Sequence, residues 1–189
     1  MKLTPLALIA AAAVAAAVVG AIVGSGALAP GAGAPPSVTL VAEPTPSPAP
    51  SGPMAHVYVV AEGKPPLRVE STYPLMTGAL LTRVASRIDG LRSTVAPEGY
   101  VNPYNTSTVR LERVTNDEPN VITLWFRVAN DDWGVPPERA KLLLQQLVWT
   151  ATEEPGIVLI RILQNEGREG GANVAGVPAN YEMTRKDFP

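Results

Sequence analysis

Four side chains that could do chemistry lie together near the end of an apolar segment. Thr150 and Thr152 carry hydroxyls, and Glu153 and Glu154 add adjacent carboxylates directly before Pro155. A threonine nucleophile needs a base within hydrogen-bonding reach, and no histidine, lysine or amino terminus is close in the sequence. We therefore predict that the two threonines bond to backbone carbonyls in the last turn of a helix.

The position of the two carboxylates is unusual. Glu153 and Glu154 follow the predicted end of a helix, where the helix dipole disfavours negative charge. An exposed pair of glutamates is the favoured interpretation, and contact with a basic partner is the alternative.

The remaining polar groups do not form a recognisable site. His56, the only histidine, begins a predicted strand without a partner for acid–base chemistry, which favours a structural or solvent-facing role. Asn130, Asp131 and Asp132 lack the alternating spacing of a calcium loop, which favours a solvated loop or a helix cap. The sequence thus predicts no catalytic residue, no cofactor and no metal.

Four aromatic residues are the candidates for contact with a ligand or a partner: Tyr100, Tyr104, Trp125 and Trp133. Trp125 lies on the face of a predicted strand opposite Phe126, and the other three lie in predicted loops. Exposed aromatic side chains are enriched in protein interfaces and glycan sites. Partial burial in the core is the alternative for all four.

The composition of the 189 residues limits the possible functions. A formal net charge of −2 gives no basic field that would hold nucleic acid or an anionic membrane surface. Without cysteine the chain has no disulfide, thiolate metal site, cysteine nucleophile or lipid-modified cysteine. We therefore do not expect an enzyme.

Residues 6–23 are apolar and uncharged. A helix of this length rises about 27 Å, which is near the lower limit for crossing a bilayer. Residues 1–29 are therefore either a cleaved signal peptide or a membrane anchor. Proline directly follows the small-residue motifs that end at Ala29 and Ala34, which suits a signal peptidase poorly and favours the anchor. Lys2 favours a cytoplasmic start, with the body of the protein outside.

The rest of the chain divides into a linker and a domain. Residues 30–53 are rich in proline, alanine and serine, and alternate prolines remove donors and fix φ, which predicts a semi-rigid linker. An edge strand at 38–41 is the alternative for that short run. Residues 54–189 hold nearly all the charge and every aromatic residue, and they are numerous enough to bury a core.

Hydrophobic periodicity predicts five strands and two helices in residues 54–189. Two prolines and Glu138 suit the start of the second helix, and Pro155 and Gly156 end it. The strand at 157–163 has few polar residues and is predicted to be internal to its sheet. The other predicted strands are 56–60, 67–70, 109–114 and 121–128. The apolar face of the first helix comprises Leu80, Leu81, Val84, Ile88 and Leu91, and Arg83, Arg87 and Asp89 lie off this face. The apolar face of the second helix comprises Ala140, Leu143, Leu144, Leu147, Val148 and Ala151.

This order, β-β-α-β-β-α-β, predicts the α+β class. The expected architecture is a single small domain in which two helices pack on one face of a mixed or antiparallel sheet. A loop of about a dozen residues is expected between the first helix and the third strand.

The second helix and the strand after it resemble the carboxy-terminal half of a known domain. A helix that ends in QLVWTATEEPGI, followed by the strand VLIRILQNEG, is similar to the sporulation and spore germination domain, GerMN. The VYVV strand, a second strand near VE, an amphipathic helix, a hairpin and TRKDF also follow the family's order. The resemblance covers about residues 56–188. The segment after the first helix departs from the family's Gly-Pro pattern, and many members are lipoproteins, whereas this chain has no cysteine.

The resemblance implies a non-enzymatic interaction or scaffolding module, related to ring-building-motif-like modules of the bacterial cell envelope. Together with residues 6–23 it implies a domain tethered to the inner membrane and facing outside the cytoplasm, or a secreted one if the signal is cleaved. The implied partners are envelope proteins or further copies of the chain, and no nucleic acid is expected. A module that binds peptidoglycan or another glycan through the loop aromatics is the alternative.

Overall fold

The computed structural model describes residues 52–165, 172–179 and 181–189. The apolar stretch 6–23 and the linker up to residue 51 lie outside these residues. None of the described helices combines the length and the apolar character that crossing a membrane requires. The elements are β1 (Met54–Ala61), β2 (Lys64–Pro74), α1 (Leu80–Gly90), η1 (Leu91–Ser93), α2 (Pro103–Thr106), β3 (Arg110–Glu118), β4 (Val121–Arg127), η2 (Ala129–Asp131), α3 (Pro137–Ala151), β5 (Leu159–Gln164), β6 (Asn173–Val174), β7 (Val177–Pro178) and η3 (Arg185–Asp187).

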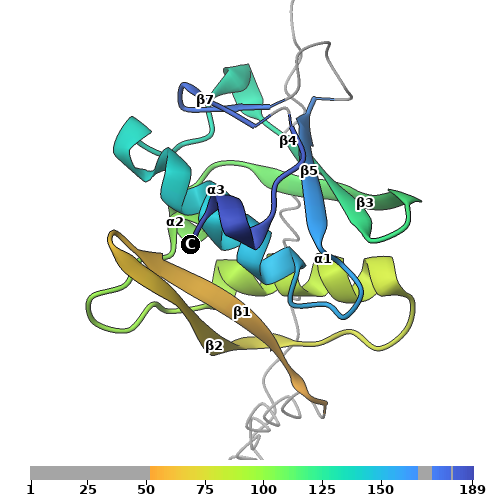
Figure 1. Ribbon diagram of the computed structural model, residues 1–189. Helices are drawn as coiled ribbons and strands as arrows, with labels where there is room; N and C mark the ends of the chain where they lie inside the picture. Colours follow the sequence, from red (N-terminus) through yellow and green to blue (C-terminus); the bar gives the residue numbers. More distant parts are fainter. Residues whose placement is uncertain (1–51, 166–171, 180) are drawn as a thin grey trace, which may run out of the picture. The chain divides into compact units, whose positions relative to one another are not determined.

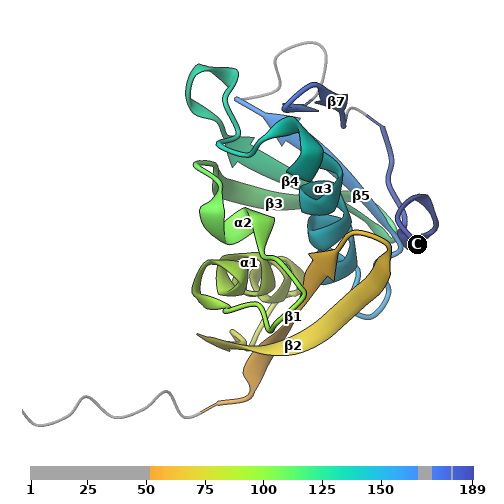
Figure 2. The same ribbon diagram turned by 90° about the vertical axis from the view of Figure 1, so that its left-hand side faces the viewer.

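The predicted α+β class is confirmed, and the longer strands lie in two sheets. β3, β4 and β5 form a mixed sheet in that order, with β4 antiparallel to β3 and parallel to β5. The parallel pair is possible because α3 crosses from the end of β4 back to the start of β5. β1 and β2 form a separate antiparallel hairpin (Figures 1 and 2).

The strand at 157–163 is not internal to its sheet, contrary to the prediction. Among the described strands β5 pairs along its length only with β4, and one further bridge joins Ile160 to Met183. Its few polar residues have another cause, because Leu159 and Leu163 add apolar side chains to the partly exposed face of the strand. β4 is the central strand.

The two predicted helices form the main connection between the hairpin and the mixed sheet. α1 contacts β1, β2 and β3, and α3 packs on β1 and β5 (Figures 1 and 2). All six residues of the predicted α3 face are fully buried. The hydrophobic core therefore includes residues of both helices and of β1, β4 and β5.

Two local features differ from the prediction. The expected loop after the first helix contains the one-turn helix α2, whose N-cap Asn102 accepts a hydrogen bond from the backbone N–H of Asn105. Arg87 lies off the apolar face of α1 and is nevertheless buried, because a carboxylate from another element reaches it.

Candidate functional site

The two glutamates that follow α3 are held by internal contacts. Glu153 accepts a hydrogen bond from the Tyr58 hydroxyl at 2.8 Å and one from Arg68 Nε at 2.7 Å. Burial alone would raise the pKa of Glu153, but the hydrogen bonds from Tyr58 and Arg68 and the charge of Arg68 outweigh burial and lower it. The predicted exposed pair is therefore wrong, and the basic partner of Glu153 lies within the same domain.

Glu154 is more deeply buried than Glu153. Its side chain is 4% exposed and lies 2.6 Å from Arg83 Nη2, while Arg87 Nε lies 3.5 Å away on the other oxygen. Both arginines come from α1. Two guanidinium groups thus offset the unfavourable position of a carboxylate at a helix carboxy terminus.

The threonine hydroxyls also serve the fold. Thr150 Oγ1 accepts a hydrogen bond from the backbone N–H of Tyr58 at 3.1 Å. Thr152 Oγ1 donates to the Val148 carbonyl at 2.7 Å, as predicted for a last helical turn, and accepts from Arg185 Nε. In the described part of the chain, the hydrogen bonds of these two hydroxyls involve no base. Thr150 and Thr152 instead join α3 to β1 and to the carboxy-terminal segment.

The four aromatic candidates separate into two pairs. Trp133 and Tyr104 are each 1% exposed, and their rings contact Phe126 at centroid distances of 5.3 and 6.2 Å. This burial fits the core alternative and is incompatible with the surface contact predicted for them. Indole and phenol rings provide large apolar areas, which accounts for their place in the core. Trp125 and Tyr100 remain partly exposed.

Trp125 is the centre of the outer face of the mixed sheet. The Arg113 guanidinium lies 4.0 Å from the Trp125 ring centroid, and Trp125 Nε1 donates to Thr115 Oγ1. Leu163 is the register partner of Trp125 on β5 and is also partly exposed. We call Arg113, Trp125 and Leu163 the Trp125 face. No described carboxylate forms an ion pair with Arg113.

The contact of Arg113 with Trp125 is not among the sequence-based predictions, although the sequence contains a pattern that indicates it. The predicted hairpin of 109–114 and 121–128 pairs an alternating strand with the strand that carries Trp125. A cross-strand pair of an arginine and a tryptophan follows if the register is known. The register was not known, because a bulge between Leu111 and Arg113 shifts the pairing by one residue.

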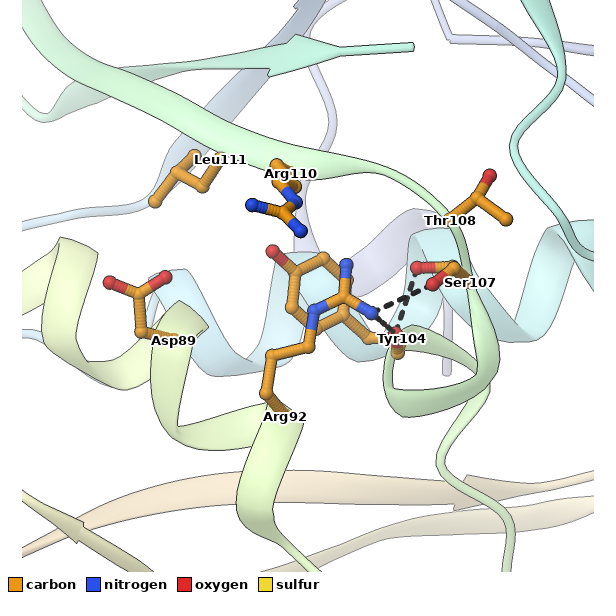
Figure 3. Close-up of a pocket in the computed structure, with 7 residues that line it drawn as sticks. All are labelled: Asp89, Arg92, Tyr104, Ser107, Thr108, Arg110 and Leu111. Carbon is orange, nitrogen blue, oxygen red and sulfur yellow. Dashed lines mark hydrogen bonds between the residues drawn. The ribbon is translucent and has the colours of Figure 1, made fainter. Parts of the chain in front are cut away.

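A polar cleft lies beside α1, between η1 and the start of β3. It has a volume of about 630 Å³ and is lined by Asp89, Arg92, Tyr104, Ser107, Thr108, Arg110 and Leu111. Figure 3 shows the Arg92 guanidinium over the Tyr104 ring, where the distance to the ring centroid is 4.2 Å.

The charged groups of this cleft have different surroundings. Arg92 donates to the backbone carbonyls of Tyr104 and Ser107, each at 2.8 Å (Figure 3), and to that of Val109, so it fixes the loop. The Asp89 side chain is exposed, but partial desolvation by its neighbours raises its pKa, and the charge of Arg92 opposes this. Burial raises the pKa of Tyr104 to about 12, again against the charge of Arg92.

The acidic loop before α3 also takes part in local structure. Asp132 Oδ1 accepts from the Gly134 N–H at 2.8 Å, and Asp131 Oδ1 accepts from Gln164 and Asn165. In the described residues no group of three or more histidine, cysteine or acidic side chains is placed to hold a metal. The backbone carbonyl of His56 accepts from Arg87 at 3.0 Å.

Comparison with known proteins gives matches in structure but not in sequence. No family model matches the chain, and no curated protein matches it either. The fold is similar to the first GerMN domain of the sporulation protein GerM from Bacillus subtilis, with 17% identity and a TM-score of 0.49 over 71% of this chain and 98% of that one. It is also similar to the "Putative Lipoprotein" from Clostridium perfringens, with 12% identity and a TM-score of 0.45 over 71% and 87%.

A third solved structure contains the tandem GerMN domains of the same Bacillus subtilis protein. It matches with 16% identity and a TM-score of 0.38, over 68% of this chain and 47% of that one. Two of these three structures contain GerMN domains.

Proposed function

We propose that this chain is a non-enzymatic interaction module of the bacterial cell envelope. Its domain is held outside the cytoplasm by the amino-terminal segment and docks partner proteins on the Trp125 face. The sequence supports the location through the apolar stretch 6–23 and the proline-rich linker. The GerMN resemblance supports the scaffolding role.

The observation that carries the proposal is the composition of the Trp125 face. Tryptophan and arginine, with tyrosine, are enriched among the residues that contribute most of the binding energy in protein interfaces. Trp125 and Arg113 stack on one another, and Leu163 adds apolar area next to them. Arg113 has no ion pair among the described residues, so its charge is available to a carboxylate of the partner.

The same geometry weighs against the glycan alternative at this face. A sugar stacks on an open aromatic ring, whereas the Arg113 guanidinium lies over the Trp125 ring at 4.0 Å. The polar groups near the end of α3 weigh against hydrolysis, because Thr150, Glu153 and Glu154 are bound to Tyr58, Arg68 and Arg83 within the fold.

Site-specific photo-crosslinking in intact cells tests the proposal. A photoreactive residue replaces Arg127, whose exposed side chain lies on the outer face of β4, in the full-length chain. The matched control carries the same residue at Glu138, which is exposed on the first turn of α3. We expect discrete protein adducts from position 127, strongly reduced by Trp125→Ala, and few from position 138.

Other outcomes separate the alternatives. Adducts of mixed size that collapse on digestion with a cell-wall hydrolase would favour the glycan-binding module. Equal adducts from positions 127 and 138, or adducts that Trp125→Ala leaves unchanged, would contradict docking on the Trp125 face. A domain digested by external protease only after the inner membrane is permeabilised would contradict the proposed location.

A further inference from the structure

The outer edge of β2 is a surface on which a further strand could dock. β2 pairs only with β1 among the described strands, and its other edge borders no described strand (Figure 1). In a strand paired on one side, alternate backbone N–H and C=O groups point to the unpaired side. Such an edge is a template for a further strand. Pro65 and Pro66 have no N–H to donate, and the register with β1 changes between Glu70 and Pro74. The regular edge is thus confined to a few residues around Val69.

The side chains on this short edge are complementary to themselves. Arg68 and Glu70 flank Val69 on either side, and both are exposed. They share one face of the hairpin, because their register partners on β1 are Tyr58 and His56. A two-fold axis through Val69 therefore places the Arg68 of each copy directly opposite the Glu70 of the other copy, which gives two equivalent pairs of opposite charge.

We infer that a second copy of this chain adds to the free edge of β2 by antiparallel β2–β2 pairing, centred on Val69. The two hairpins then form one four-stranded antiparallel sheet. This contact lies on a different surface from the Trp125 face and requires no partner there. It goes beyond the proposed function by naming the occupant of the edge and its register.

Charge fixes that register. A two-fold axis perpendicular to the sheet places equivalent side chains of the two copies on the same face of the joint sheet. The pairing of the two β2 strands can therefore shift only in steps of two positions. The neighbouring registers centre on Arg68 or on Glu70, and each of these puts two like charges directly opposite one another. Opposite charges on paired residues stabilise a sheet and like charges destabilise it, so the register centred on Val69 is favoured.

Arg68 is able to make the new contact without leaving its present one. Its Nε donates to Glu153 Oε1 at 2.7 Å, while its side chain is 50% exposed. Its two Nη groups bond to no described residue. The bond to Glu153 fixes the side chain, which lowers the entropy lost when the Nη groups meet a carboxylate from the second copy.

Disulfide trapping tests the contact. Because the chain contains no cysteine, an introduced cysteine has no native thiol with which to form a competing disulfide. Directly paired residues of antiparallel strands have Cα atoms about 4.5–5.5 Å apart, which is within disulfide range. We expect Val69→Cys, in the full-length chain in detergent, to form a covalent dimer under mild oxidation. Thr72→Cys is the control, because residue 72 would lie about 20 Å from its copy in this register.

A charge complementation experiment tests the register independently. In the Val69→Cys background, Glu70→Lys places lysine opposite Arg68, and Arg68→Glu places glutamate opposite Glu70. Each variant alone should form dimer about tenfold more slowly. A mixture of the two should recover the original rate, because only the mixed dimer has opposite charges at both pairs.

The inference is overturned if Val69→Cys stays monomeric while the chain sediments as a monomer, or if Thr72→Cys cross-links equally fast. A covalent dimer whose rate is insensitive to Glu70→Lys, or variants that mixing does not rescue, overturn the register and with it the inference. The photo-crosslinks from position 127 should persist in the Glu70→Lys chain, so failure here is distinguishable from failure of the Trp125 face.

Discussion

The carboxylate of Glu154 lies 2.6 Å from the guanidinium of Arg83, although 71 positions separate them in the sequence. Glu154 follows the carboxy terminus of α3, where the helix dipole opposes a negative charge. Arg83 and Arg87 on α1 supply the positive charge that makes this position tolerable. The pair therefore fixes where the end of α3 meets α1, and hence how the mixed sheet meets the hairpin.

Removing this carboxylate should be strongly destabilising. Glu154→Gln removes the paired carboxylate from the partly buried Arg83 and from the buried Arg87, which then keeps only the nearby charge of Glu153 among the described carboxylates. Breaking a buried ion pair from one side costs about 3–5 kcal/mol, and because Arg83 is partly exposed we expect a loss of about 3 kcal/mol. Equilibrium urea unfolding of the variant and the parent measures it.

The matched control is Glu182→Gln, which removes an exposed partner of Arg161. Exposed ion pairs contribute little, and Arg161 also keeps Glu118. We expect no resolvable change in the urea midpoint. If both variants lost equal stability, the burial of Glu154 would not be the cause.

These contacts show what the sequence could and could not predict. Periodicity identified the apolar faces of α1 and α3 and the alternation of β4, because burial on one face leaves a repeating pattern. Periodicity placed Arg87 off the apolar face of α1 and gave no indication that its side chain is buried. Helical spacing has no information about the carboxylate of Glu154, which comes from another element. The same limit applies to Glu153, whose partners Tyr58 and Arg68 lie on the hairpin.

The candidate site was predictable to the same extent. Trp125 was placed correctly on the strand face opposite Phe126, because period-two alternation is local. Trp133 was placed in a loop, and it does precede α3, but its ring enters the core and Nε1 donates to Gln164. A loop position does not specify side-chain direction, which here depends on the long-range contact with Phe126.

The ion pair at Glu153 should make stability depend on acidic pH. Although burial opposes it, hydrogen bonds from Tyr58 and Arg68 lower the pKa of Glu153 below its ordinary value of 4.5. A lowered pKa in the folded state means that the carboxylate stabilises the fold above pH 4.5. That contribution is lost as the pH falls through the folded value.

Glu153→Gln checks this assignment. As the pH falls below 4.5, the free energy of unfolding of the parent should decrease more steeply than that of the variant, as measured by urea unfolding at each pH. Parallel slopes for the two proteins would show that other carboxylates cause the acid dependence.

Tyr104 should ionise only at strongly alkaline pH. Burial raises its pKa from 10.0 to about 12, against the opposing charge of Arg92. Because the folded pKa is raised, the neutral phenol contributes stability below pH 10.0, and that contribution is lost as the pH rises towards 12. Absorbance titration at the phenolate band should show a step near pH 12 that Tyr104→Phe removes. If the step remains in the variant, another tyrosine is responsible.

Among the described glycines, Gly134 should be the least tolerant of a methyl group. It precedes Val135 in the turn that leads to α3, its φ is +65°, and an added Cβ would lie 2.5 Å from Thr108 Cγ2 and 2.7 Å from the Thr108 backbone nitrogen. The backbone contact cannot be relieved by a rotamer change, and the Thr108 N–H is held by the Trp133 carbonyl. Gly134→Ala should therefore combine left-handed strain with a displaced strand start.

Gly176→Ala separates these two contributions. Gly176 lies in the turn between β6 and β7 with φ of +91°, and an added Cβ would meet nothing within 4 Å. We expect about 1–2 kcal/mol of destabilisation from the left-handed backbone alone. Gly134→Ala should lose a further 1–3 kcal/mol or so by overpacking. Urea unfolding followed by tryptophan fluorescence measures both variants, and equal losses would mean that the segment at Thr108 moves aside freely.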